Sequence, residues 1–122
     1  MARWRFSQPA EADLANILAT SRARWGIDGR RRYASLVTAA IRLVAADPEG
    51  PTTRNRTDLL AGARSLHLRH ARAAAPQPTT QQPVHVLYFR VSRPGLIEIV
   101  RVLHERMEPS RHIGDDLQDD QS

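Results

Sequence analysis

Basic side chains that could bind or act on a phosphate gather near the C-terminal end of this 122-residue sequence. Five of them fall within twelve residues: Arg101, His104, Arg106, Arg111 and His112. Arg90 lies on the preceding predicted strand. Guanidinium groups bind phosphates and an imidazole can transfer protons, so anion binding and acid–base chemistry on RNA both fit this cluster. A solvated sheet end, with arginines paired to neighbouring glutamates, is the alternative interpretation.

A second basic cluster, Arg30-Arg31-Arg32, falls at the start of a predicted helix. Positive charges there oppose the helix dipole, so the run is either a solvated face or a docking site. The five histidines do not follow a recognisable ligand spacing, and no metal site is predicted. The sequence also lacks a phosphate-binding loop, a dinucleotide fingerprint and a Gly-x-Ser-x-Gly motif, so we expect no cofactor.

The charge of the chain is unevenly distributed. All 18 basic residues counted as Lys or Arg are arginines, and the chain has no lysine. Residues 1–113 carry a net charge of +9 and residues 114–122 carry −4. A basic body of this kind attracts polyanions, either nucleic acid or an acidic protein segment. The sequence therefore predicts one basic domain over 1–113 and a disordered acidic tail over 114–122.

The composition also restricts the class of protein. Leu, Ile, Val and Phe make up only 27 of the 122 residues, which predicts a small core. The sequence has no cysteine, no apolar run near the ~20 residues that span a bilayer, and no signal peptide at its N-terminus. We therefore expect a cytoplasmic protein without a membrane partner. Five aromatic residues are predicted to lie in the core or at its rim: Trp4, Trp25, Tyr33, Tyr88 and Phe89.

Two helices follow a short strand in the first half of the chain. Alternation over residues 2–6 predicts the strand, after which Ser7 can cap a helix that Gly26 ends. Asp28 can cap a second helix, which ends at Pro48 and has apolar residues at helical spacing. The two amphipathic helices predict an antiparallel hairpin that must bury its apolar side against another layer.

The second half changes to the period of a sheet. Residues 48–63 have the composition of a loop, and strands are predicted over 64–69, 84–91 and 96–103. The Ala/Pro/Gln/Thr-rich stretch 71–83 is predicted to be a flexible surface insertion. The order β-α-α-β-β-β indicates an α+β fold, a small antiparallel sheet packed against the helical hairpin.

These elements and their motifs resemble the ParE branch of the RelE/ParE toxin superfamily, the toxin half of bacterial type II toxin–antitoxin (plasmid stabilisation) modules. The likeness extends over about residues 3–113 without the 71–83 stretch. The matching segments are Ser7-x-x-Ala10-x-x-Asp13-Leu14-x-x-Ile17, Trp25-Gly26, Tyr33, Leu36, Pro48, Arg64-Ser65-Leu66, His85 to Val91, Ile97 to Met107 and Arg111-His112-Ile113.

The resemblance implies a lethal toxin that a cognate, ParD-like antitoxin neutralises in a hetero-oligomer. ParE-type members inhibit DNA gyrase, whereas RelE-type relatives cleave ribosome-bound mRNA with basic residues, commonly lysines, and a C-terminal tyrosine or histidine. Because this chain lacks lysine and its closing segment lacks tyrosine, we expect a gyrase inhibitor that is not an enzyme. The alternatives are an mRNA endoribonuclease, using His104 with Arg101 and Arg106, and a decayed toxin that acts as a basic binding module.

The same resemblance gives the basic clusters a role. An apolar groove between hairpin and sheet would take an amphipathic segment of the antitoxin, with arginines facing its acids. The residues expected to contact target or antitoxin are Arg90, Arg101, His104, Arg106, Arg111, Arg30, Arg31 and Arg32.

Overall fold

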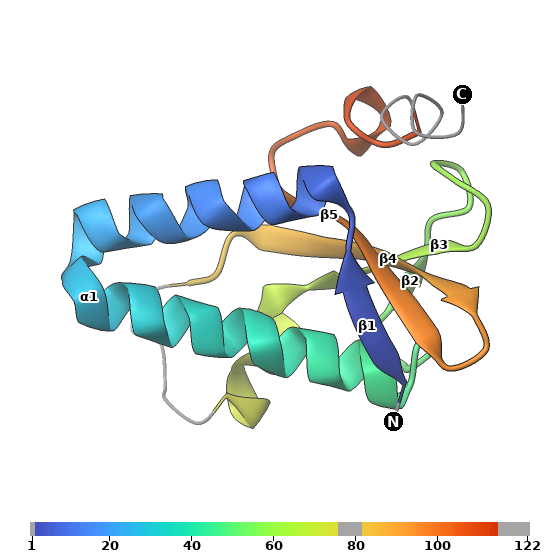
Figure 1. Ribbon diagram of the computed structural model, residues 1–122, viewed down its shortest axis with the longest axis horizontal. Coiled ribbons are helices and arrows are strands. Elements are labelled where there is room, and N and C mark those ends of the chain that lie inside the picture. The colour runs from blue at the N-terminus through green and yellow to red at the C-terminus, as the bar shows by residue number, and fades with distance from the viewer. Residues whose placement is uncertain (1, 76–81, 115–122) are drawn as a thin grey trace.

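A helical hairpin lies on one face of a twisted five-stranded sheet (Figure 1). The computed structural model describes residues 2–75 and 82–114. The alternating N-terminal residues form β1 (Arg3–Phe6), and the chain then enters the long helix α1 (Gln8–Ala46). The helix begins where predicted, because the Ser7 hydroxyl accepts a hydrogen bond from the Ala10 N–H at 3.1 Å.

Gly26 divides α1 into the two predicted antiparallel halves, 8–25 and 27–46 (Figure 1). Its φ of 76° lies in the left-handed region, which glycine adopts without steric cost. Two details of the prediction are wrong. Asp28 lies within the helix and does not cap it, and the Trp25 side chain is 51% exposed at the bend.

Four further strands and two short 3-10 helices complete the chain: β2 (Arg54–Asn55), β3 (Ala63–His67), η1 (Leu68–Ala74), β4 (His85–Arg93), β5 (Leu96–His104) and η2 (Pro109–Arg111). The strand order is β1-β5-β4-β3-β2. The predicted α+β class is confirmed, but the sheet is mixed and not purely antiparallel, because β1 pairs in parallel with β5. β2 adds an edge strand within the segment 48–63, which was predicted to be a loop.

The predicted flexible surface insertion at 71–83 is wrong for its first residues. Residues 71–74 end η1, which packs against α1, and Ala71 is fully buried in the main core. The small alanine side chains of η1 allow it to pack closely against α1. Residues 76–81, together with residues 115–122 of the predicted acidic tail, lie outside the described residues.

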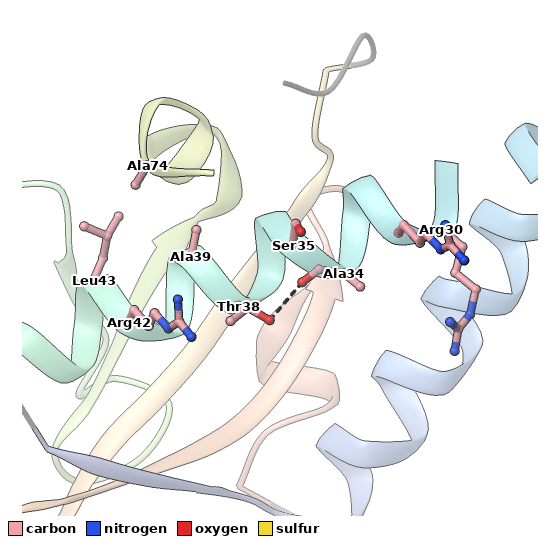
Figure 2. Close-up of a pocket in the computed structure, with 9 residues that line it drawn as sticks. Arg30, Ala34, Ser35, Thr38, Ala39, Arg42, Leu43 and Ala74 are labelled. Carbon is pink, nitrogen blue, oxygen red and sulfur yellow. Dashed lines mark hydrogen bonds between the residues drawn. The ribbon is translucent and has the colours of Figure 1, made fainter. Parts of the chain in front are cut away.

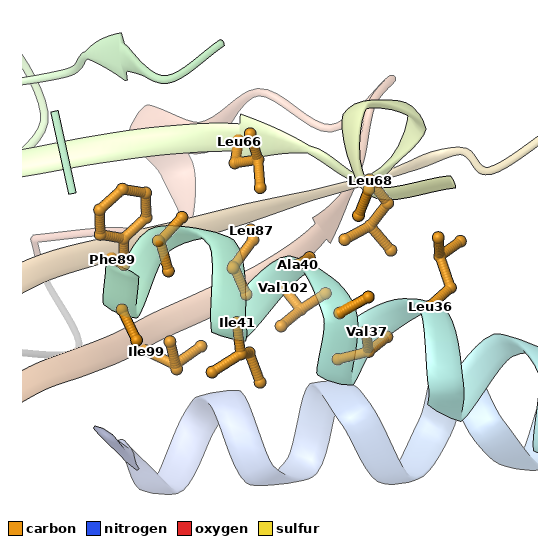
Figure 3. Close-up of a cluster of buried hydrophobic side chains, with 14 of the residues drawn as sticks. Leu36, Val37, Ala40, Ile41, Leu66, Leu68, Leu87, Phe89, Ile99 and Val102 are labelled. Carbon is orange, nitrogen blue, oxygen red and sulfur yellow. The ribbon is translucent and has the colours of Figure 1, made fainter. Parts of the chain in front are cut away.

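The main core fills the space between α1 and the sheet (Figure 3). Its α1 side chains keep the predicted helical spacing, and they meet apolar residues from β3, β4, β5 and η1. The buried residues labelled in the figure are Leu36, Val37, Ala40, Ile41, Leu66, Leu68, Leu87, Phe89, Ile99 and Val102. A smaller cluster on the other face of the sheet contains Tyr88, Val100, Leu103 and Ile113.

The start of α1 also covers the open edge of β5. β1 ends at Phe6, opposite Ile99, so the rest of β5 lacks a neighbouring strand on that side. The Ser7 hydroxyl donates to the Val100 carbonyl at 2.7 Å, and the Asp13 carboxylate accepts from the Val102 N–H at 3.0 Å. Side chains of α1 therefore satisfy backbone groups that a strand would otherwise pair.

Candidate functional site

Arg101, predicted to contact a partner, is instead tied into the fold. Its Nε and Nη2 donate to the two carboxylate oxygens of Asp13 at 2.7 and 2.9 Å, and Nη1 donates to the His112 carbonyl at 3.0 Å. Both side chains of the ion pair are only 14% exposed. Bidentate pairing of this kind fixes geometry as well as charge. Arg101 thus joins β5, α1 and the C-terminal segment, and presents little of its charge to a partner.

The other predicted residues of the C-terminal cluster do not form one site. Arg90 donates to Glu98 at 2.9 Å, and Arg5 lies 3.4 Å from the same carboxylate. Glu98 and His104 are six residues apart on β5, about 20 Å along a strand, so Arg90 is remote from the imidazole. Arg106 and Arg111 are exposed beyond the end of β5.

His104 does belong to a polar chain that sequence reasoning overlooked. It stands opposite His85 in the β4–β5 ladder, with ring centroids 5.6 Å apart in an edge-on arrangement. His85 Nδ1 in turn lies 2.5 Å from the Tyr33 hydroxyl on α1. Tyr33 was predicted to lie in the core or at its rim, and it is half-buried where the second half of α1 meets the sheet. The chain Tyr33–His85–His104 therefore links the helical hairpin to two strands.

The protonation states in this chain follow from burial. Burial raises the pKa of Tyr33 to about 12, although a hydrogen bond from the Val84 backbone opposes the shift. Burial and the neighbouring His104 lower the pKa of His85 to about 4, so both groups are neutral at pH 7. His85 Nδ1 then accepts from the Tyr33 hydroxyl. His104 Nδ1 accepts from the Arg106 N–H at 3.1 Å, so the ring proton of His104 lies on Nε2.

A cavity of about 430 Å³ opens beside this chain, between the two halves of α1 and the adjoining ends of β4 and β5. We call it the hairpin–sheet cavity. Among the described residues that line it none is acidic, and two are arginines. They are Asn16, Ile17, Thr20, Ser21, Arg24, Trp25, Gly29, Arg32, Tyr33, Gln82, Val84, His85, His104 and Met107.

A second concavity, of about 650 Å³, lies on the outer side of the second half of α1 (Figure 2). We call it the arginine groove. Ala74 of η1 faces Ala39 and Leu43 across it (Figure 2). The remaining lining residues are Arg30, Arg31, Ala34, Ser35, Thr38 and Arg42. The predicted cluster Arg30-Arg31-Arg32 is therefore divided, since Arg32 lines the hairpin–sheet cavity.

The juxtaposition of His85 and His104 could have been found from the sequence. The turn between β4 and β5 centres on Pro94-Gly95, and positions 85 and 104 lie equally far from it along the chain. Two irregularities in the ladder, at Tyr88/Phe89 and Val91/Arg93, cancel and restore this register. No comparable signal joins Tyr33 to His85, because that contact depends on the packing of α1 against the sheet.

Acidification from pH 6.5 to pH 4 should destabilise the protein through His85. The pKa of this ring is about 4 when folded, and that of an unfolded histidine is 6.5. Between these values the unfolded state binds a proton that the folded state excludes, so the free energy of unfolding falls with pH. Because the ring lines a cavity open to solvent, we expect a loss of about 1–2 kcal/mol.

Urea unfolding at pH 7.0 and pH 4.5 measures this loss. His85→Gln keeps an acceptor for Tyr33 but removes the titrating ring, so the difference in urea midpoint between the two pH values should shrink. Glu105, whose pKa His67 lowers by hydrogen bonding, titrates in both proteins and serves as an internal control. An equal pH dependence in wild type and variant would contradict the assignment.

The described part of the chain shows neither a cluster of metal-ligating side chains nor a membrane-spanning helix. Within residues 2–75 and 82–114, no three His, Asp or Glu side chains come close enough to hold a metal ion. In the same residues, neither α1 nor a shorter helix has the apolar stretch that crossing a bilayer needs.

The fold is shared with a toxin–antitoxin structure. A chain of the chromosomal ParDE TA system from P. aeruginosa superposes with a TM-score of 0.60 at 18% identity, covering 85% of this chain and 96% of that chain. The sequence identifies the family, which the likeness in fold alone does not. Residues 4–109 match the family described as ParE toxin of type II toxin-antitoxin system, parDE, and the chain belongs to this family.

Individual relatives agree with the family assignment. The chain is 34% identical over 115 residues to Toxin ParE1 of Caulobacter vibrioides, covering 93% of this chain and all of the relative. It is 30% identical over 112 residues to Toxin ParE1 of Mycobacterium tuberculosis, covering 92% of this chain and 98% of the relative. The resemblance stated from the sequence is thereby confirmed.

Proposed function

We propose that this protein is a cytoplasmic toxin that a cognate antitoxin neutralises and that inhibits DNA gyrase without acting as an enzyme. Membership of the ParE family over residues 4–109 carries this proposal. The engagement of Arg101 with Asp13 supports a non-enzymatic toxin, since it removes one of the three basic residues that an endoribonuclease would use. Arg106 and Arg111 are exposed and remain candidates for contact with the target.

The arginine groove is the surface that we propose for the antitoxin. Its floor is made of small and apolar side chains, including Ala39 and Leu43, and Arg30, Arg31 and Arg42 lie around it. An amphipathic helix can place its apolar face in such a groove while its acidic residues meet the guanidinium groups. In residues 2–75 and 82–114, none of these three arginines pairs with a carboxylate.

Reversing charges in the groove should weaken the complex. We expect Arg30→Glu with Arg42→Glu to lower affinity for the co-encoded antitoxin by about 10- to 100-fold, through repulsion of its acidic side chains. Calorimetric titration measures the affinity. The matched control is Arg54→Glu with Arg93→Glu, which makes the same change in net charge at exposed positions outside the groove. Equal losses in the two double variants would show that only overall charge matters.

The target is tested with the purified protein. A gyrase inhibitor should trap cleaved gyrase–DNA complexes and leave translated mRNA intact. Cleavage of mRNA in a translating extract, abolished by His104→Ala, would identify an endoribonuclease instead. DNA binding that weakens steeply with salt, with gyrase and mRNA both unaffected, would identify a decayed toxin that acts as a basic binding module. Expression without the neighbouring antitoxin gene should stop growth, and co-expression should restore it.

A further inference from the structure

The hairpin–sheet cavity is separate from the arginine groove, and its chemistry differs. Two of its lining residues, Arg24 and Arg32, come from opposite halves of α1. In the described residues neither guanidinium forms an ion pair with a carboxylate. Since none of the described lining residues is acidic, the local potential favours a negatively charged ligand. Glu105, which follows His104 in the chain, is engaged by His67, with Oε2 and Nε2 2.6 Å apart.

Other polar side chains of the lining suit oxygen atoms of a phosphate or a sugar. His104 can donate from Nε2, because its Nδ1 already accepts from the Arg106 backbone. The side chains of Asn16, Thr20 and Gln82 add hydroxyl and amide groups. Amides of this kind can donate and accept at once, which matches the edge of a nucleobase.

An aromatic surface stands at the rim of the same cavity. The Trp25 indole is 51% exposed beside the bend at Gly26, an unusual position for so large an apolar side chain. Met107, 47% exposed, lies among the same lining residues. An exposed indole provides a stacking surface for a planar ring, and a thioether adapts to its edge.

We propose that the hairpin–sheet cavity binds a nucleotide. Arg24 and Arg32 hold the phosphate, Trp25 stacks on the base, and the amides of Asn16 and Gln82 contact polar groups of the ligand. The volume of about 430 Å³ falls within the range of small-molecule sites. The proposal does not depend on the identity of the toxin's target, and the cavity shares no lining residue with the arginine groove.

Titration of the purified chain with AMP, followed by tryptophan fluorescence and calorimetry, tests the site. AMP should quench Trp25 and raise Tm, because a ligand bound only by the folded state stabilises it. Arg24→Gln with Arg32→Gln should weaken AMP binding by at least about tenfold, the effect of losing ~1.4 kcal/mol. The control pair Arg22→Gln with Arg93→Gln removes the same charge elsewhere and should leave affinity unchanged. Equal weakening by both pairs overturns the proposal, as does absence of saturable binding.

Separate ligands test the two halves of the site. Inorganic phosphate and ribose 5-phosphate should bind more weakly than AMP to wild type, and Trp25→Ala should reduce affinity for AMP to their level. Equal affinity for AMP and inorganic phosphate would overturn the role of the base. A terminal phosphate beside a base also occurs at the 5′ end of a nucleic acid strand. If a 5′-phosphorylated tetranucleotide binds more tightly than AMP, the site is assigned to strand ends. If the tetranucleotide binds more weakly than AMP, the site is assigned to free nucleotides.

Discussion

Replacing Asp13 by alanine should lower the free energy of unfolding by about 3–5 kcal/mol, because it removes the bidentate carboxylate that the largely buried Arg101 guanidinium binds. The same substitution removes the acceptor of the Val102 N–H on the open edge of β5. Arg101→Met should cost a similar amount, since it leaves the Asp13 carboxylate without its bidentate partner. Chemical denaturation followed by circular dichroism measures both losses.

The double variant separates charge pairing from the other bonds. Asp13→Leu with Arg101→Met removes both charges, so its loss should be smaller than the sum of the single losses. It should not return to wild-type stability, because the Val102 N–H and the His112 carbonyl still lack their partners. Arg93→Met is the control and should change stability by less than about 0.5 kcal/mol. A loss of under 1 kcal/mol for Asp13→Ala would contradict a structural role for this pair.

The expected loss of stability also changes how a loss of toxicity in an Arg101 variant should be interpreted. If Arg101 were a contact residue, as the sequence suggested, Arg101→Met would stay folded and bind its partner poorly. The structure predicts instead that the variant loses activity because its folded state is destabilised. Arg106→Gln provides the comparison, since Arg106 is exposed and its substitution should leave stability unchanged. Only a folded and inactive variant is informative about the target.

Local signals in the sequence were sufficient for the helical hairpin and for the β4–β5 ladder. Ser7 and Gly26 mark the start and the bend of α1 through capping and a left-handed backbone, which depend on a few neighbouring residues. The turn at Pro94-Gly95 sets the register that brings His85 opposite His104. Both are short-range features, so patterns of type and spacing can encode them.

The features that were missed depend on contacts between distant segments. β1 and β5 are separated by most of the chain, and no local pattern fixes the parallel direction of their pairing. Asp13 and Arg101 are 88 residues apart, so no local pattern indicated that Arg101 is separate from the basic cluster. Trp25 has the expected helical spacing but sits at the bend, where the hairpin turns its side chain outward.

Ala71→Asp should destabilise the protein by about 3 kcal/mol or more, although the surrounding sequence has the composition of a surface loop. The Ala71 side chain is fully buried where η1 packs against α1, and a carboxylate there would lose its hydration among apolar neighbours. The same packing orders the chain directly after β3. Thermal and urea unfolding measure the loss.

A second alanine of η1, Ala73, provides the matched control for Ala71→Asp. Ala73 lies in the same 3-10 helix, two residues further along, but is exposed. Ala73→Asp changes charge and composition identically, so it should alter stability by less than about 0.5 kcal/mol. A flexible insertion would tolerate both substitutions equally, whereas a packed η1 tolerates only the second. Equal stability of the two variants would therefore restore the surface-loop interpretation, and a large difference would place the end of η1 within the folded core.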